Sequence, residues 1–337
     1  MKKRMRDANM SPLLIAFIVT ALAFDFLNGF HDSANIVATM ISSRAMSPRR
    51  ALLLSAAAHF IAPFLFGVAV ATVIGHEVVQ PYASTMAVVL SALLAAIVWN
   101  LITWSLGIPS SSSHALVGGL VGAAIVGYGV DAVQLHGLTK VTVALLLSPP
   151  VGLLGGYAFM KLVLFLARGA SPRINWFFKR AQTFTALGLA LSHGTNDAQK
   201  TMGIITMGLV GAGVLKQFQV PWWVVTASAS AISLGTALGG WRIIRTLGGK
   251  FYKIRPVHGF TTQVTSTAVI LGAALLGGPV STTQVVSSAI LGVGSAERLS
   301  KVRWKVAGNI LTAWILTIPA SGLLAALAYL MVRRIVM

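Results

Sequence analysis

The chain has 337 residues, of which 56% are hydrophobic and 10% charged, and its mean hydropathy is +0.81. These values exclude a soluble domain of ordinary composition and predict an all-α polytopic membrane protein. The formal net charge of +19 would suggest a nucleic-acid partner in a soluble protein. Here the lysines and arginines fall in short loops between apolar segments, so we expect a lipid bilayer around the chain and no nucleic-acid binding.

Apolar stretches near the length needed to cross a bilayer recur along the chain. We expect five membrane segments in the first half, near 12–43, 51–74, 84–106, 108–130 and 138–167, and five in the second, near 183–213, 221–245, 259–278, 279–295 and 306–332. The predicted organisation is a first transmembrane repeat at 1–168, a basic cytoplasmic linker at 169–182, and a second, inverted repeat at 183–337.

The two halves share sequence patterns at a nearly constant spacing. NGFHDSANIVATMI contains Asp32, and HGTNDAQKTMGII contains Asp197, 165 positions later. GIPSSSSHALVGGLVGAA begins at Gly107 and aligns with GGPVSTTQVVSSAILGVG at Gly277, an offset of 170. An odd number of segments in each half inverts the second half. Inverted-topology repeats of about five segments, with broken helices or re-entrant hairpins at the midplane, are a known plan of secondary transporters.

The distribution of positive charge orients the segments. Alternate threading places the lysines and arginines of four internal loops on one side, and leaves Lys140 and Lys216 in the opposite loops. The side rich in lysine and arginine is cytoplasmic by the positive-inside rule, although the basic N-terminal tail, Lys2 to Arg6, then falls on the outer side. We therefore expect a multi-pass protein of the cytoplasmic (inner) membrane.

Acidic residues are rare, and three of the seven, Asp25, Asp32 and Asp197, fall inside predicted membrane segments. A charged residue facing lipid costs about 2.5 to 3.5 kcal/mol on the insertion scale, so these carboxylates must face the bundle interior or bound cations. Gly29 and Gly194 would let the helices unwind, so that backbone carbonyls add oxygen ligands. Such a site suits Na⁺ at Asp32 and Asp197 as readily as a proton.

Other polar residues of the two motifs are candidates for the same site. The expected coupling-ion residues are Asp32, Asp197, Asn28, Asn35 and Asn196, with Lys200, Asp25 and His31 as further candidates. The alternative is that the aspartates cap half-helices or pair with Lys200. Three roles stay open for Lys200: counterion of either aspartate, phosphate ligand, or snorkelling residue. Asp25 has no acidic counterpart in the second half.

Two clusters of hydroxyl residues each follow a proline and open an apolar, glycine-rich helix. They are Ser111, Ser112 and Ser113 in the first half and Ser281, Thr282 and Thr283 in the second, with Gln284 as a further candidate. Helix starts present unpaired N–H groups and a positive dipole end, so the paired clusters predict an anion site. The alternative is that the hydroxyls only cap the helices. Segments 108–130 and 279–295 either cross fully or fold back as re-entrant hairpins.

Histidines accompany these motifs: His31 and His193 stand beside the aspartates, and His114 follows the serine run. A histidine among carboxylates can carry protons, but we favour a neutral hydrogen-bonding partner. Ser192, His193 and Asp197 would allow an intramembrane hydrolase on paper. No Gly-x-Ser-x-Gly elbow surrounds Ser192, so we expect no enzyme and no catalytic residue.

GFHDSANIVAT with SSRAMSPRRA, and SHGTNDAQKTMGI in the second half, resemble the two signature motifs of the inorganic phosphate transporter (PiT, or PHO4) family. The resemblance implies inverted-repeat, homodimeric symporters that carry phosphate with Na⁺ or H⁺, in some bacteria as neutral metal phosphate complexes. It implies coupling-ion and phosphate contacts at Asp32, Asn35, Asn196 and Asp197, and phosphate contacts at the two hydroxyl clusters. The first motif has Phe-His-Asp where many members have Ala-Asn-Asp, which removes one amide oxygen. The chain lacks the long central loop of animal members, which suits a prokaryotic protein.

We therefore expect a secondary transporter that imports inorganic phosphate with Na⁺ or H⁺ by alternating access and needs no other cofactor. The rivals are a symporter of another oxyanion such as sulfate, and an anion channel. Both aspartates favour phosphate, because a protonated oxyanion has a hydrogen to donate to a carboxylate and sulfate has none. A channel has no need of paired buried carboxylates. The coupling ion, its stoichiometry, and metal phosphate as cargo stay open.

Overall fold

The computed structural model describes residues 12–336, and every named element in that range is a helix, as the composition predicts. The first half contains α1 (Pro12–Ser42), α2 (Pro48–Ile61), η1 (Ala62–Phe64), α3 (Ala69–Thr72), η2 (Val73–Glu77), η3 (Pro81–Ala83), α4 (Met86–Leu106), α5 (Ser112–Tyr128), η4 (Val130–Ala132) and α6 (Leu135–Leu166). The second half contains α7 (Ile174–Gly211), α8 (Trp222–Leu238), α9 (Trp241–Arg245), η5 (Thr246–Lys250), α10 (Pro256–Leu275), α11 (Thr282–Glu297), η6 (Leu299–Lys301) and α12 (Trp304–Val336). The basic N-terminal tail lies outside the described residues.

Helix length and composition identify the membrane spans. Within the described range, α1, α4, α6 and α12 are four helices long and apolar enough to cross a membrane. Two bent pairs raise the number to six if each counts as one span: α2–η1 with α3–η2, bent by 72°, and α8 with α9–η5, bent by 57°. Each predicted membrane segment therefore contains a helix, but not every helix is a full span by these criteria.

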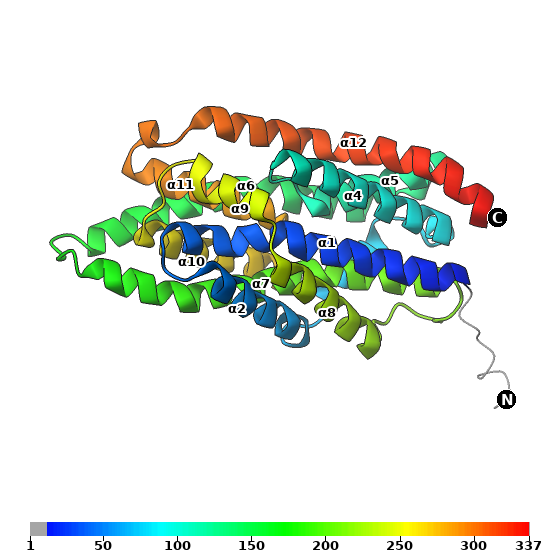
Figure 1. Ribbon diagram of the computed structural model, residues 1–337. Coiled ribbons are helices and arrows are strands. Elements are labelled where there is room, and N and C mark those ends of the chain that lie inside the picture. Colours follow the sequence, from blue (N-terminus) through cyan, green and yellow to red (C-terminus); the bar gives the residue numbers. More distant parts are fainter. Residues whose placement is uncertain (1–11, 337) are drawn as a thin grey trace.

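Matched helices of the two halves run in opposite directions. In Figure 1, α1 begins and α12 ends at one end of the bundle (right), whereas the connection from α6 to α7 lies at the other end (left). It follows that α1 runs opposite to α7, and α6 opposite to α12, which is what an inverted repeat requires. The halves also interlock: α1 packs on α8 and α7 on α2, while α6 packs on α11 and α12 on α5.

Two helical hairpins, α4–α5 and α10–α11, reach into the bundle. Gly107 and Gly277 stand in their turns with φ angles of 66° and 71°, a left-handed conformation that glycine adopts without strain. The turn of α4–α5 lies within the bundle and not at its end (Figure 1). The two turns touch, because the Ser113 hydroxyl donates to the Val280 carbonyl at 3.3 Å. The turns of the two hairpins therefore meet inside the bundle, which is the arrangement that the re-entrant alternative predicts.

The prediction that Gly29 and Gly194 unwind their helices is wrong: α1 and α7 continue through both. A Cβ atom at Gly29 would lie 2.1 Å from the Ile232 carbonyl oxygen, and one at Gly194 would lie 3.0 Å from the Ala62 Cβ. These glycines therefore let neighbouring helices approach closely. Their backbone carbonyls belong to continuous helices and are not freed as ligands. The chain instead leaves helical geometry at 65–68, between η1 and α3, and at 239–240, between α8 and α9.

The expected linker, 169–182, is only partly a loop. Helix α7 begins at Ile174, so that 174–182 forms its first turns. The halves are consequently joined by a short turn from α6 into α7 at one end of the bundle (Figure 1).

Candidate functional site

The carboxylate of Asp32 is buried, with 1% of the residue exposed, and meets both hairpins. Its Oδ1 accepts a hydrogen bond from the Thr283 hydroxyl at 3.0 Å and lies 2.8 Å from His31 Nδ1. Its Oδ2 lies 3.5 Å from the Ser112 hydroxyl. The Asn35 amide nitrogen donates to the same Thr283 hydroxyl at 3.0 Å. The first-half aspartate is thus held by the helix starts of α5 and α11 together.

The carboxylate of Asp197 is equally buried and has a positive partner. The Lys200 ammonium group bonds to its Oδ1, and the Thr282 hydroxyl donates to its Oδ2 at 3.1 Å. Lys200 also donates to the Ser113 hydroxyl at 2.6 Å and to the Val280 carbonyl at 3.1 Å. All three ammonium hydrogens therefore have acceptors, and Lys200 is the counterion of Asp197 in this structure.

The two aspartates converge although they are far apart in sequence. One ligand atom each from Asp32, Asp197 and His193 lies within 4.8 Å of the others, and all three residues are buried. His193 Nδ1 is 3.3 Å from Asp197 Oδ2, but the angle is not that of a hydrogen bond. Two carboxylates at this separation oppose each other's ionisation. A cation or proton shared by them would relieve that repulsion, and their oxygens are hard ligands of the kind Na⁺ takes.

The three asparagines of the motifs carry free amide oxygens. Asn35 and Asn196 each use the amide nitrogen, the latter as donor to the Gly278 carbonyl at 3.3 Å. Their Oδ1 atoms, and both amide atoms of Asn28, are buried with no hydrogen-bond partner among residues 12–336. Buried polar atoms normally have partners, so these oxygens are candidates for contact with a bound ion.

The first hydroxyl of each cluster caps its helix. Ser111 accepts from the backbone N–H of His114 at 3.1 Å, and Ser281 accepts from that of Gln284 at 3.3 Å. The capping alternative therefore describes these two side chains, whereas the hydroxyls that follow them point to the aspartates and the lysine. The N-terminal ends of α5 and α11 also direct their positive dipole ends toward this region.

His59 lies next to the site but was not predicted from the sequence. The ring of His59, on α2, stacks on that of His193 with centroids 5.0 Å apart, and its Nδ1 lies 2.8 Å from the Thr236 hydroxyl. A single histidine inside the apolar segment 51–74 was the available signal. The contacts made by the Gly278 and Val280 carbonyls could not be read from residue types, because every residue has a carbonyl group.

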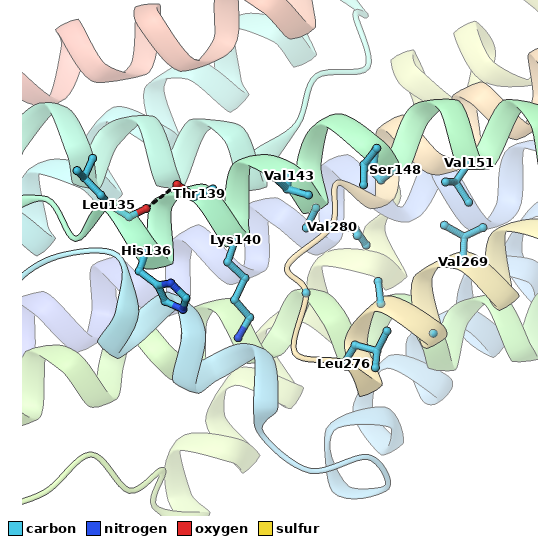
Figure 2. Close-up of a pocket in the computed structure, with 15 residues that line it drawn as sticks. Leu135, His136, Thr139, Lys140, Val143, Ser148, Val151, Val269, Leu276 and Val280 are labelled. Carbon is cyan, nitrogen blue, oxygen red and sulfur yellow. Dashed lines mark hydrogen bonds between the residues drawn. The ribbon is translucent and has the colours of Figure 1, made fainter.

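Two hollows of the described bundle lie beside the site. The Gln284 side chain helps to line a pocket of about 920 Å³ formed by α6, α11 and α12, and it has no bond to either aspartate. Figure 2 shows another, of about 870 Å³, between α6 and α10, where mainly apolar side chains surround it and His136 and Lys140 lie at one end. Val280 lines this second groove, while its carbonyl oxygen accepts from Lys200. The aspartates themselves are closed off from solvent.

Inverted helical repeats, hairpins that meet inside the bundle and paired buried carboxylates at their meeting point are features of membrane transporters. The chain belongs to the phosphate transporter (PHO4) family, whose model matches residues 28–176 and 166–325. It is therefore a multi-pass membrane transporter of inorganic phosphate and not an enzyme. In agreement, the Ser192 hydroxyl, which a hydrolase would need, donates to the Gly188 carbonyl at 2.8 Å.

Relatives cover almost the whole chain. A protein of Bacillus subtilis strain 168, named "Probable low-affinity inorganic phosphate transporter", is 46% identical over 327 residues, which is 96% of this chain and 98% of that protein. A Rhizobium meliloti protein of the same name is 44% identical over 326 residues, with the same two coverages. A solved structure described as "The sodium-dependent phosphate transporter" has a TM-score of 0.86 at 26% identity and covers 96% of this chain and 99% of that one.

Proposed function

We propose that this chain imports inorganic phosphate across the cytoplasmic membrane of a prokaryotic cell, coupled to Na⁺ or H⁺, by alternating access. The observation that carries the proposal is the convergence of Asp32 and Asp197 at the starts of α5 and α11. Anion donors and cation ligands thereby meet in one buried place. The name of the solved neighbour, a sodium-dependent transporter, supports a cation as partner.

The charges of the buried site support the proposed coupling. Asp32, Asp197 and Lys200 carry a net charge of −1 if the nearby histidines are neutral, and a phosphate ion makes the site more negative still. An uncompensated buried charge costs several kcal/mol. Phosphate would therefore enter the closed site with a cation or proton, and the cation would gain most from closure when phosphate is present. Neither would cross efficiently alone.

The proposed ligands divide by chemistry. Hydroxyls and helix-start N–H groups bind phosphate, and oxygens of the two motifs bind the coupling ion. The phosphate set is Ser112, Ser113, Thr282 and Thr283, with the backbone at Ser111 and Ser281; the ion set is Asp32, Asp197, Asn28, Asn35 and Asn196. Lys200 would fix the charge of Asp197 and contact phosphate when Ser113 moves aside.

Radiolabelled phosphate uptake into proteoliposomes tests the proposal. A Na⁺ gradient and a proton gradient are imposed separately, and Asp32→Asn and Asp197→Asn are run beside the wild type. We expect one gradient to drive accumulation and both variants to abolish it. Equilibration of phosphate whatever the gradient, with the variants active, would instead favour an anion channel and a structural role for the carboxylates.

Competition experiments address the cargo. Sulfate at equal concentration should compete poorly, because it has no proton to donate to a carboxylate. Strong inhibition by sulfate would favour a general oxyanion symporter. Adding Mg²⁺ tests a metal phosphate complex, for which uptake should rise with the metal. We further propose a homodimer, and a mass measurement in detergent by light scattering would reveal a monomer if this is incorrect.

A further inference from the structure

The groove between α6 and α10, called here the α6–α10 groove, is a long hollow on a membrane-spanning helix (Figure 2). One wall is a single face of α6 from Leu135 to Val151, and the other is formed by α10 with the turn that contains Val280. Only 28% of the apolar 18-residue window of α6 is buried inside the bundle. A Cβ atom at Gly272, on α10, would meet nothing within 4 Å. The groove, of about 870 Å³, is therefore open where α6 faces lipid.

The lining of the groove suits a hydrocarbon chain. Its two hydroxyl groups, those of Thr139 and Ser148, each donate to a backbone carbonyl of α6, at 2.7 and 3.1 Å. The Val280 carbonyl accepts from Lys200 on the bundle side of the turn. These polar groups are thus used within the protein, and the remaining surface beyond the first turn of α6 is mainly apolar. Apolar surface of this kind gains free energy when an apolar chain covers it.

Opposite charges stand together at one end of the groove. His136 and Lys140 lie there (Figure 2), and the Lys140 ammonium group is 3.4 Å from the Glu77 carboxylate. The Lys140 and Glu77 side chains are 40% and 32% exposed, so their pairing is weak and can open around a ligand. A headgroup that carries both a phosphate and a primary ammonium group matches this end. The phosphate would bind Lys140 and His136, and the ammonium group would bind Glu77.

The groove has the length of one leaflet of a bilayer. From Leu135 to Val151, α6 rises about 24 Å at 1.5 Å per residue. Half of a typical bilayer, headgroups included, is about 20–23 Å thick. A phospholipid whose headgroup lies at the charged end would therefore extend its acyl chains along the whole apolar wall.

We propose that the α6–α10 groove binds one phospholipid of the phosphatidylethanolamine class. Its acyl chains lie on the apolar wall, and its headgroup lies between Lys140 and Glu77. The chains then contact Val280, at the turn that supplies an acceptor to Lys200, so the bound lipid stabilises the α10–α11 hairpin in the closed position. This inference goes beyond the proposed function, because binding of the lipid requires neither phosphate nor a coupling ion.

Native mass spectrometry of the full chain in detergent, without phosphate or an ion gradient, tests the proposal. Dioleoyl phosphatidylethanolamine, dioleoyl phosphatidylcholine and dioleoyl phosphatidylglycerol are titrated separately, since they share acyl chains and differ in the headgroup. The first molecule of phosphatidylethanolamine should bind at least about threefold more tightly than either of the others, as expected for exposed charge pairs. It should also raise the unfolding midpoint of the wild type, because it binds the folded chain.

Variants test each end of the groove against a matched control. Gly272→Leu fills the hollow and should weaken phosphatidylethanolamine binding at least about tenfold, because it displaces several methylene groups of the chains. Gly272→Ala adds only a Cβ that meets nothing, and should bind as the wild type. Lys140→Gln and Glu77→Gln should each weaken binding about three- to fivefold. Lys216→Gln is the charge control, since Lys216 shares the less basic set of loops with Lys140 but does not line the groove.

The outcomes distinguish the occupants. Unchanged phosphatidylethanolamine binding by Gly272→Leu would overturn the groove as the site. Equal or tighter binding of phosphatidylglycerol by the wild type would overturn the amino headgroup. Loss of the dimer in Gly272→Leu, with no lipid bound by the wild type, would assign the groove to a second copy and overturn the proposal. If Gly272→Leu fails to fold, the partly exposed Lys140 and Glu77 variants decide the test.

Discussion

Replacing Lys200 with Met tests the buried ion pair of the site. The ammonium group bonds to Asp197, to the Ser113 hydroxyl and to the Val280 carbonyl, and the residue is 1% exposed. Removing one partner of a buried pair costs about 3–5 kcal/mol, because the other charge is left uncompensated. We expect Lys200→Met to lower the free energy of unfolding by that amount in a Na⁺-free buffer. Asp197→Asn, which strands the ammonium group, should cost about as much.

The double variant, Lys200→Met with Asp197→Asn, gives the free energy of unfolding that decides the test. With both charges removed, the remaining loss is that of two neutral acceptors, Ser113 and Val280, at about 0.5–1.5 kcal/mol each. The double variant should therefore lose only about 1–3 kcal/mol, well below the sum of the single variants. Reversible unfolding in mixed SDS micelles measures all four proteins. Additivity of the single losses within about 0.5 kcal/mol would refute the buried pair. Na⁺ should partly restore Lys200→Met, because it can replace the missing cation.

Three further predictions concern packing, pH and ligand contact. Gly29→Ala should destabilise the protein by about 1–3 kcal/mol or prevent folding, because its Cβ would lie 2.1 Å from a backbone oxygen of α8. A Cβ at Gly249 would meet nothing within 4 Å, so Gly249→Ala is the control and should be tolerated. The unfolding midpoints of the two variants provide the comparison. The hydrogen bond from His258, beyond the membrane spans, holds the pKa of the Glu297 carboxyl well below its ordinary 4.5. This depressed pKa adds stability above pH 4.5 that is lost as the pH falls below it, so Glu297→Gln should flatten the fall of the unfolding midpoint in acid. Thr283→Val removes a donor to the first aspartate and should raise the KM for phosphate uptake about tenfold, and an unchanged KM would contradict its place in the site.

The duplication made much of the architecture predictable. Matched residues such as Gly107 and Gly277 sit in equivalent turns with nearly equal φ angles, because both halves must reverse the chain at the same point. The hydroxyls after each turn then meet the aspartates of the motifs. A polar pattern that occurs twice at one spacing in an apolar chain indicates a shared site, since each polar residue must find a partner inside the bundle.

Tertiary packing decided what the residue pattern left open. A glycine beside an aspartate fits an unwound helix and a close helix contact equally well, and only the backbone of α8 against Gly29 distinguishes them. Lys200 had two aspartates within reach of its motif, and the hairpin turn that supplies the Val280 carbonyl places its ammonium group at Asp197. The place of His59 beside the site is visible only from its ring stacked on that of His193.

The duplicated site is chemically unequal in a way that bears on coupling. Asn35 and Lys200 each follow their aspartate by three positions, so one half has a neutral amide where the other has a fixed ammonium group. Asp197 therefore keeps a counterion whether or not an ion is bound, while the hydrogen-bond partners of Asp32 within residues 12–336 are the ring of His31 and two hydroxyls, with no lysine or arginine among them. In the proposed cycle the charge that must be neutralised anew in each turnover is that of Asp32. Substitutions in the first-half motif should accordingly change the ion dependence of uptake. Substitutions in the second-half motif should mainly change the stability of the closed site.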